Sequence, residues 1–341
     1  MILIKVNPFY PEEEKIKVAA KAIRSGNLVA FPTETVYGLG ADAFNENAVR
    51  KIFEAKNRPA DNPLIIHIAS IEQFFEIVDT EQAKEIENVA NKVWPGPITF
   101  VAKKKEGCKI ARSATAGLST VAVRMPAHPV ALALIRQSGV PIAAPSANLA
   151  TKPSATKAEH VFEEFKDKVD VLLDAGNTFY GLESTIIDIT RNPPALLRPG
   201  PFTVEELERI FGRIEVSEGA RGLKTADVPI APGMKYRHYA PDKPLVLCDK
   251  DKIAKAIDDA KNKGLKPILL VSNETASHFN GVDAIALGSE QNMYEIAKNL
   301  FDALKRLDKT DADIGIAQTF PERGIGLAIM NRLRKAASVK D

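Results

Sequence analysis

A segment rich in proline and glycine divides the chain into two parts. From Ser217 to Pro244 the sequence holds three glycines and four prolines, and no apolar pattern of helix or strand period continues through it. A stretch this long without regular structure is uncommon inside a compact domain and is typical of a linker or a functional lid. The chain of 341 residues is also longer than one average domain. We therefore predict a first domain at residues 1–216, a linker at 217–243 and a second domain at 244–341.

The first part mixes strand and helix patterns at uneven spacing. Short apolar or alternating runs predict strands at 28–31, 64–68, 98–102, 120–124, 141–144 and 185–189. Helical spacing predicts one helix that begins near Pro11, another around Ala48, Ile52 and Phe53, and others at about 81–93, 130–137 and 157–165. This irregular order predicts an α/β (α+β) domain with a twisted, open, mixed sheet.

The second part alternates strands and helices more regularly. Strand patterns fall at 245–247, 267–271, 284–287 and 314–317, and helical patterns fall at 252–261, 292–307 and 327–336. This order predicts a small, Rossmann-like parallel α/β domain whose sheet is covered by helices. It carries neither the glycine-rich dinucleotide fingerprint nor a P-loop, so a nucleotide site is not indicated there.

Composition excludes several broad classes of protein. The formal net charge of +2 gives no global basic footprint for nucleic acid, although a local basic groove is compatible with it. Apolar runs are much shorter than a bilayer span, and the N-terminal run lacks the features of a signal peptide, so we expect a cytoplasmic protein without a membrane anchor. The two cysteines, Cys108 and Cys248, have no metal-like spacing and are expected to stay reduced.

Polar residues gather where the predicted strand at 28–31 ends. Residues 31–40 read F-P-T-E-T-V-Y-G-L-G, so that Thr33 and Thr35 flank a carboxylate. Loops at strand ends commonly carry ligand-binding groups, and the two glycines permit tight turns. A helix that starts here, capped by Thr33 or Thr35, explains the same residues equally well.

Residues 56–63 read K-N-R-P-A-D-N-P and follow a predicted helix. Cations at a helix C-terminus are favourable on electrostatic grounds alone, so a dipole cap is one interpretation. The other interpretation is an anion clamp, because alternate positions of an extended segment would direct Lys56 and Arg58 at one polyphosphate. The two prolines would keep such a loop stiff and lower the entropic cost of binding.

Two predicted strands each place a polar side chain in an otherwise apolar run. His67 lies on the minority face of the strand at 64–68, where a hydrogen-bonded structural histidine is the commoner outcome. Thr120 and Arg124 share one face of the strand at 120–124. A buried arginine needs an anionic partner, which is either a ligand carboxylate or an internal glutamate.

Short polar groups follow further predicted strands. Ser146 and Asn148 suit contacts with phosphate or ribose, although both residue types are also common in turns. Ser154, Ser184 and Arg198 are able to join the same pocket, but none of them is informative alone. Motifs for a serine hydrolase, a zinc protease or a Cys/His metal site are absent from the sequence.

The linker has an unusual composition for a tether. Residues 232–241 read P-G-M-K-Y-R-H-Y-A-P, in which basic and aromatic residues alternate. A flexible tether would be expected to be rich in glycine and serine or in acidic residues. A solvated tether remains one interpretation, and the aromatic residues favour a segment that docks on another surface.

Together these segments resemble the YrdC-like threonylcarbamoyl-AMP synthases over about the first 210 residues. The F-P-T-E-T-V-Y-G-L-G stretch, the K-x-R of Lys56 and Arg58 and the S-x-N of Ser146 and Asn148 carry the resemblance by their joint order and spacing. The linker and second domain resemble the longer, two-domain branch. The resemblance implies synthesis of L-threonylcarbamoyl-AMP from L-threonine, bicarbonate or CO₂, and ATP, with release of pyrophosphate. It also implies Mg²⁺ held by the nucleotide, and a separate transferase complex that uses the product to modify tRNA.

The resemblance further implies roles for single residues. Contacts with ATP are expected from a set that includes the candidate catalytic pair Lys56 and Arg58, namely Lys56, Arg58, Asn62, Thr120, Ser146, Asn148, Ser154 and Arg198. Contacts with threonine are expected from Thr35, His67, Arg124 and Ser184, with Arg124 on the carboxylate. Tyr236 and Arg237 in the linker are expected to close over the site as a lid that excludes water.

Other functions account for the patterns less well. An RNA-binding module with a basic concave sheet would be expected to carry aromatic residues along its strands, and the predicted strands hold few. A carbamoyl-adenylate enzyme that uses carbamoyl phosphate would need further modules, including zinc fingers, for which the chain lacks length and cysteines. The expected adenylation requires positioning and charge neutralisation more than a protein nucleophile, which agrees with the absent nucleophile motifs.

Overall fold

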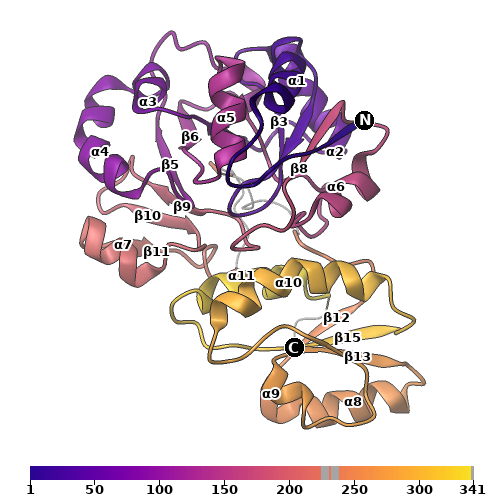
Figure 1. Ribbon diagram of the computed structural model, residues 1–341. Helices are drawn as coiled ribbons and strands as arrows, with labels where there is room; N and C mark the ends of the chain where they lie inside the picture. The colour runs from indigo at the N-terminus through magenta and orange to yellow at the C-terminus, as the bar shows by residue number, and fades with distance from the viewer. Residues whose placement is uncertain (224–229, 232–237, 339–341) are drawn as a thin grey trace.

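The computed structural model describes residues 1–223, 230–231 and 238–338. The chain forms two α/β parts, one above the other in Figure 1, and each has its own sheet. The first sheet has 11 strands and is mixed, and the second has four parallel strands. Both predicted fold types are confirmed. The linker bounds stay a prediction, because much of residues 217–243 lies outside the described ranges.

The large sheet has the strand order β1-β8-β2-β3-β7-β4-β6-β5-β9-β10-β11. Its strands are β1 (Ile2–Lys5), β2 (Val29–Phe31), β3 (Gly38–Asp42), β4 (Ile65–His67), β5 (Ile98–Lys103), β6 (Thr120–Arg124), β7 (Ile142–Ala143), β8 (Val171–Asp174), β9 (Thr185–Asp188), β10 (Ala195–Arg198) and β11 (Glu215–Val216). Its helices are α1 (Glu13–Arg24), α2 (Glu46–Lys56), α3 (Ile71–Ile77), α4 (Thr80–Val93), α5 (Pro129–Ser138), α6 (Ala158–Phe165) and α7 (Val204–Phe211). Parallel and antiparallel neighbours are mixed, since β4 is parallel to β6 and antiparallel to β7.

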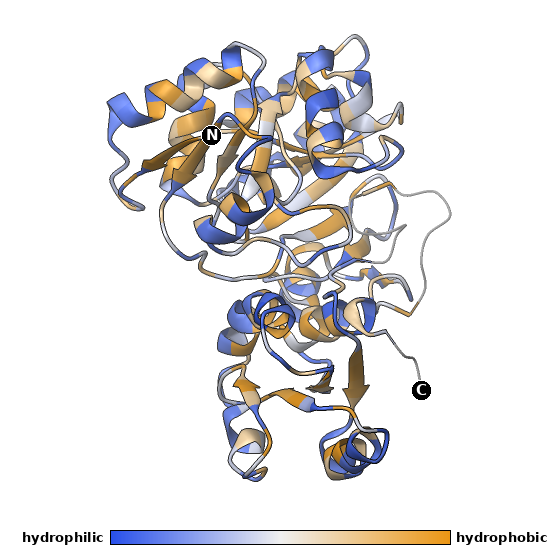
Figure 2. Ribbon diagram, turned by 90° about the vertical axis from the view of Figure 1, so that its right-hand side faces the viewer, coloured by the Kyte–Doolittle hydropathy of each residue, from blue (hydrophilic) through white to orange (hydrophobic). Residues whose placement is uncertain are grey.

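Apolar side chains cover both faces of the large sheet. Val29 and Phe31 pack with residues of α1 and α5, whereas Ala30 joins the cluster that includes residues of α2 and α4. Successive residues of a strand point to opposite faces, so β2 alone contributes to both layers. In Figure 2 the strands carry mostly the hydrophobic colour, whereas the helices change between the hydrophilic and hydrophobic colours along their length.

The second sheet has the order β12-β15-β13-β14. Its strands are β12 (Leu245–Cys248), β13 (Pro267–Val271), β14 (Ala284–Ala286) and β15 (Ile314–Gln318), and its helices are α8 (Ile253–Asn262), α9 (Asn273–Ala276), α10 (Met293–Asp308) and α11 (Gly326–Ala336). Helices α10 and α11 lie between this sheet and the first part, and α8 and α9 lie on the far side (Figure 1). Within the described ranges, none of the helices combines the length and apolar content that a bilayer span requires.

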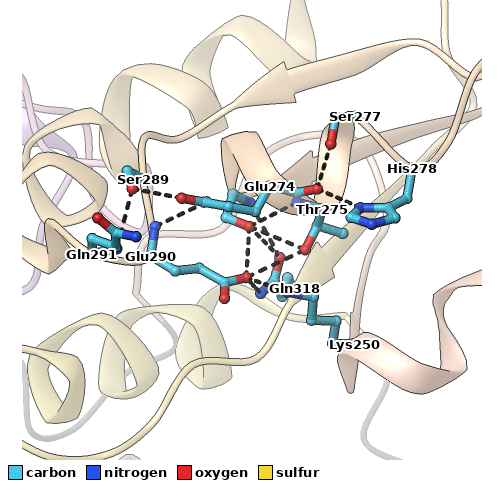
Figure 3. A network of polar contacts seen from close by, with 10 residues as sticks. Lys250, Glu274, Thr275, Ser277, His278, Ser289, Glu290, Gln291 and Gln318 are labelled. Atoms are coloured by element: carbon cyan, nitrogen blue, oxygen red, sulfur yellow. Dashed lines mark hydrogen bonds and ion pairs between the residues drawn. The ribbon is translucent and has the colours of Figure 1, made fainter.

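A polar network closes the carboxyl ends of the parallel strands in the second part (Figure 3). Ser272 Oγ and Gln318 Nε2 donate to Glu290 Oε1 at 2.7 and 2.9 Å, and Lys250 Nζ lies 2.8 Å from the same oxygen. The hydrogen bond from Lys250 is the largest cause that lowers the pKa of Glu290 to about 2. Ligands commonly bind at this edge of parallel α/β sheets. Here a carboxylate of the chain itself takes up the converging donors.

Several elements of the first part were not predicted from the sequence, namely β1, β3, β8, β10, β11, α3 and α7. The most consequential is β3, because it begins inside the 31–40 segment and shows that the helix-cap interpretation of Thr33 or Thr35 was wrong. The Phe31 ring packs over this strand, and a Cβ added at Gly38 or Gly40 would come within 3.2 or 2.7 Å of it. Burial on both faces and these glycines remove the alternation that reveals a strand.

Candidate active site

A cavity of about 210 Å³ lies where strand ends and loops of the first part meet the linker. Its walls come from the loop after β2, the end of α2, the strands β4 and β6, the loop after β7 and the residues next to β9 and β10. His238 and Tyr239, at the described end of the linker, complete the walls. The predicted site residues that line it are Thr35, Lys56, Arg58, Asn62, His67, Arg124, Ser146, Asn148, Ser184 and Arg198.

Two of the described predicted residues, Thr120 and Ser154, do not line the cavity. Thr120 begins β6, at the opposite end of that strand from Arg124, and pairs with Lys103 of β5. Five residues of strand separate the two ends by about 13 Å, which keeps the Thr120 side chain away. Ser154 is fully buried, and its Oγ donates to Glu183, which lines the wall. Tyr236 and Arg237 lie outside the described residues, so the lid contact stays a prediction.

Arg124 joins the 31–40 segment to the end of β6. Its Nη1 donates to Thr35 Oγ1 at 2.9 Å, and its Nε donates to the Gly96 carbonyl at 3.3 Å. Its Nη2 lies 2.6 Å from Glu34 Oε1, an ion-pair distance without hydrogen-bond geometry. The sequence left open whether this arginine serves an internal glutamate or a ligand. The structure provides the glutamate and also places the guanidinium on the cavity wall.

His67 lies beside Arg124, because β4 pairs with β6 in that register. Its Nδ1 is 3.2 Å from the Ile65 carbonyl, and its ring meets the Phe31 ring edge to face. Burial, followed by the positive charge of Arg124, lowers the pKa of His67 to about 3. The imidazole is therefore neutral at pH 7 and offers hydrogen bonds to a ligand without adding charge.

Lys56 connects the K-x-R motif to the S-x-N motif of Ser146 and Asn148. Its Nζ donates to the Ser146 carbonyl at 2.5 Å and to the Asn148 carbonyl. Burial, followed by the charge of Arg58, holds the pKa of Lys56 well below its usual value. The prediction that 56–58 is extended was wrong, because Lys56 ends α2 and Asn57 caps it with a left-handed φ of 51°. This turn nevertheless brings Lys56 and Arg58 to the same cavity.

Two asparagines and a serine form the adjoining wall. Ser146 Oγ donates to Asn148 Oδ1 at 2.5 Å, which confirms that the two side chains lie on one side. Arg58 Nη2 donates to the Asn62 carbonyl at 2.9 Å. The Asn62 side chain is fully buried, and neither its Nδ2 nor its Oδ1 has a hydrogen-bond partner among the described residues. Such an amide on a cavity wall is suited to a polar ligand.

Ser184 and Arg198 adjoin each other across β9 and β10. Arg198 Nε donates to the Ser184 carbonyl at 3.0 Å, and its Nη2 donates to Ser184 Oγ at 3.1 Å. Ser184 Oγ also lies 2.8 Å from Thr99 Oγ1. Burial lowers the pKa of Arg198 from its ordinary value. A neighbouring anion would offset the cost of burying this charge.

Glu183, His238 and Tyr239 are among the wall residues that the sequence did not assign to the site. Glu183 directly precedes Ser184, but a single glutamate in a loop carries no signal of its own. His238 and Tyr239 belong to the aromatic and basic linker pattern that predicted docking, and Tyr239 packs 5.1 Å from the Phe301 ring with a left-handed φ of 66°. Burial is the main cause that lowers the pKa of His238 to about 3.

The charge on the described cavity wall is strongly one-sided. Five lysines and arginines face one carboxylate, and the cations are Lys56, Arg58, Arg124, Lys152 and Arg198. The carboxylate, Glu183, is paired with an arginine from the second part. This arrangement is suited to a carboxylate at the Arg124 end and to a polyanion along the remaining wall.

Comparisons with known proteins cover nearly the whole chain. A family model for Sua5, YciO and YrdC, described as telomere recombination, matches residues 21–200, and a model described as threonylcarbamoyl-AMP synthase, C-terminal domain, matches 202–338. Threonylcarbamoyl-AMP synthase of Pyrococcus abyssi is 50% identical, over 96% of this chain and 96% of the relative. The enzyme of that name from Bacillus subtilis is 45% identical, over 95% and 93%.

A solved structure agrees with these matches. The crystal structure of P. abyssi Sua5 complexed with L-threonine superposes with a TM-score of 0.92 at 49% identity. The match covers 99% of this chain and 98% of that one. The similarity therefore extends over both parts of the chain.

Proposed function

This chain belongs to the Sua5/YrdC family of threonylcarbamoyl-AMP synthases, and from this premise we infer that it is an enzyme that makes L-threonylcarbamoyl-AMP. The observation that carries the inference is the buried Arg124 on the cavity wall, in a fold that superposes on the P. abyssi relative complexed with L-threonine. We propose ATP and bicarbonate, or CO₂ derived from it, as the other substrates.

The threonine end of the cavity is proposed to lie around Arg124. Its guanidinium is suited to the carboxylate, because a planar fork matches two carboxylate oxygens. Thr35 and Ser184 offer hydroxyls, and His67 offers a neutral imidazole, so the amino-acid hydroxyl and amine have hydrogen-bonding partners nearby. A neutral histidine avoids repulsion of an amine that must react.

The ATP end is proposed to follow the cationic wall. Lys56, Arg58 and Arg198 would face the phosphates, while Asn62, Ser146 and Asn148 offer amide and hydroxyl groups to ribose or phosphate. Thr120 and Ser154 remain proposals for ATP, although neither side chain lines the described cavity. A side-chain contact from either would require movement of the wall.

The reaction is proposed to proceed in two steps. The threonine amine adds to CO₂ and loses a proton, which gives a carbamate. A carbamate oxygen then attacks the α-phosphorus of ATP, a P–O bond forms, and the bond to the leaving pyrophosphate breaks. The chain contributes orientation and neutralisation of the negative charge that builds up on the phosphates. Lys56 and Arg58, which share the cavity, are the groups proposed to supply it.

Magnesium fits this site only as a companion of the nucleotide. Among the residues that the structure describes, no group of three or more histidine, cysteine, aspartate or glutamate side chains is placed to hold a metal ion. Glu183, the carboxylate on the described wall, is already paired with an arginine. We therefore keep Mg²⁺ as an expected companion of ATP, which itself offers phosphate oxygens of the kind that this ion prefers.

The product is proposed to serve tRNA modification through a separate transferase complex, in the cytoplasm. The RNA-binding alternative has no support from the comparisons, which name synthases. A pyrophosphate-release assay tests the proposal, with threonine or bicarbonate omitted in turn. Release should require both, and release that is independent of threonine would contradict it.

A further inference from the structure

Arg332 in α11 crosses from the second part into the wall of the active site. It is the largest of the fully buried side chains in the described ranges. Its Nε and Nη2 donate to Glu183 Oε2 at 3.1 and 3.0 Å, and its Nη1 donates to the Pro199 carbonyl at 2.6 Å. Both acceptors belong to the first part, so this residue of the second part is built into the first.

Glu183 is the point at which Arg332 reaches the cavity. It lines the cavity next to Ser184, and its Oε1 accepts from Ser154 Oγ at 2.6 Å. Burial alone would raise the pKa of Glu183, but the charges of Arg332 and then Arg198 lower it to about 2. The carboxylate is therefore ionised at neutral pH, and two arginines are coupled to it.

The second part also packs against two loops of the active site, one that contains Val36 and one that contains Leu182. Val36 and Leu182 belong to the apolar core of the second part, together with residues of α10 and α11. A Cβ added at Gly181 would lie 2.2 Å from the Lys298 carbonyl oxygen in α10, so the backbones are in direct contact there. Val36 follows Thr35 and Leu182 precedes Glu183, so two site loops are packed against the second part.

We propose that Arg332 is a positioning residue for ATP binding. Arg332 neutralises the charge of Glu183, so that Arg198 stays hydrogen-bonded to Ser184 and directed at the nucleotide phosphates. This inference rests on the proposed function, because it takes Arg198 as an ATP-binding group. Without Arg332, the buried carboxylate would attract Arg198 more strongly, since an unpaired buried charge is unfavourable. Arg198 would then leave Ser184 and the cavity wall. Through Arg332, the second domain thus contributes to the ATP site.

The test uses the full chain and two matched variants. Arg332→Met removes the charge while retaining a long apolar side chain, and we expect the KM for ATP to rise about tenfold or more. The KM for threonine should change less than about threefold, because Arg124 is not altered. The double variant Arg332→Met/Glu183→Gln removes both charges, so Arg198 is no longer attracted, and the KM for ATP should return to within about threefold of wild type.

Recovery of the KM for ATP in the double variant distinguishes positioning of Arg198 from simple docking of the domains. The double variant also lacks the Arg332–Glu183 ion pair, so a role in docking alone would not recover. Lys309→Ala is the docking control, since Lys309 pairs with Glu163 across the two parts at 2.6 Å on the surface, and its KM for ATP should be unchanged. If circular dichroism shows that Arg332→Met is unfolded, Arg332→Lys takes its place, because it keeps the charge without the forked contact, and its KM for ATP should rise by less than about tenfold.

Two results would overturn the inference. One is a folded Arg332→Met variant with the wild-type KM for ATP, and the other is a double variant that is no better than the single one. If wild-type protein releases no pyrophosphate in response to threonine, the proposed function fails instead. Calorimetric binding of ATP to the same variants then still tests Arg332.

Discussion

Replacement of Arg124 separates its internal ion pair with Glu34 from the contact with threonine that we propose for it. Arg124 is paired with Glu34 in the interior and also opens into the cavity. Arg124→Met leaves the Glu34 carboxylate, which is 7% exposed, without its partner at 2.6 Å. The double variant Arg124→Met/Glu34→Gln removes both charges. The internal role should recover in the double variant, and the threonine-binding role should not.

The expected magnitudes follow from the burial of the pair. Removal of one partner of a buried ion pair typically costs about 3–5 kcal/mol, whereas replacing both with neutral groups of similar volume is close to neutral. We therefore expect the free energy of unfolding to fall by about 3–5 kcal/mol in Arg124→Met and to return most of the way in the double variant. A hydrogen bond to a charged group contributes about 1.5–3 kcal/mol, so loss of one weakens threonine binding by about 10- to 150-fold in both variants.

Denaturant unfolding measures the first quantity, and titration calorimetry with threonine measures the second. Pyrophosphate release at varied threonine concentration gives a kinetic check, in which the KM for threonine should rise far more than the KM for ATP. A double variant that binds threonine as well as wild type would show that Arg124 serves only the internal pair. A single variant with wild-type stability would refute the assignment of Glu34 as its partner.

Three further predictions concern other parts of the site. Lys56→Ala should abolish threonine-dependent pyrophosphate release, because it removes a cation and the contacts to the 146–148 segment, and full activity would reject the clamp. The free energy of unfolding should fall less steeply on acidification in His67→Gln, by the equivalent of up to one bound proton. The reason is that between about pH 3 and 6.5 His67 is protonated only in the unfolded chain. If the free energy of unfolding, measured with denaturant at several pH values, has the same slope against pH as in the wild type, the prediction is contradicted. Gly40→Ala should cost about 1–3 kcal/mol in unfolding free energy, since its Cβ would meet Phe31 and Ile142 at 2.7 Å, and Gly38→Ala should cost less.

Local periodicity predicted much of the site. The alternation in β4 and β6 placed His67 and Arg124 on the face opposite their apolar neighbours, and both line the cavity. Such predictions succeed because the orientation of a strand side chain depends on the residues directly beside it. The order of the K-x-R and S-x-N motifs gave the family, and the Lys56 contacts to the 146–148 segment explain why the two motifs occur together.

Other features depend on contacts that no local pattern records. Arg332 and Glu183 are 149 positions apart, and the sequence around Arg332 reads as an ordinary helix in a separate domain. The alternate cations Lys56 and Arg58 had indicated an extended segment, but the chain makes a left-handed turn at Asn57 instead. A helix end can also bring two side chains to the same place. In both cases the packing between elements decided the outcome, which sequence spacing alone does not specify.

The electrostatics of the wall explain why the overall charge was uninformative. A net charge of +2 is compatible with a strongly cationic cavity, since most carboxylates lie elsewhere on the chain. Burial lowers the pKa of Lys56 and of Arg198, which means that the folded chain disfavours their charged forms in the absence of a ligand. A bound polyphosphate would favour those charged forms and raise both pKa values, so binding and protonation of Lys56 are linked. The same burial that makes these cations costly therefore makes the site selective for anions, because a neutral ligand would leave that cost in place.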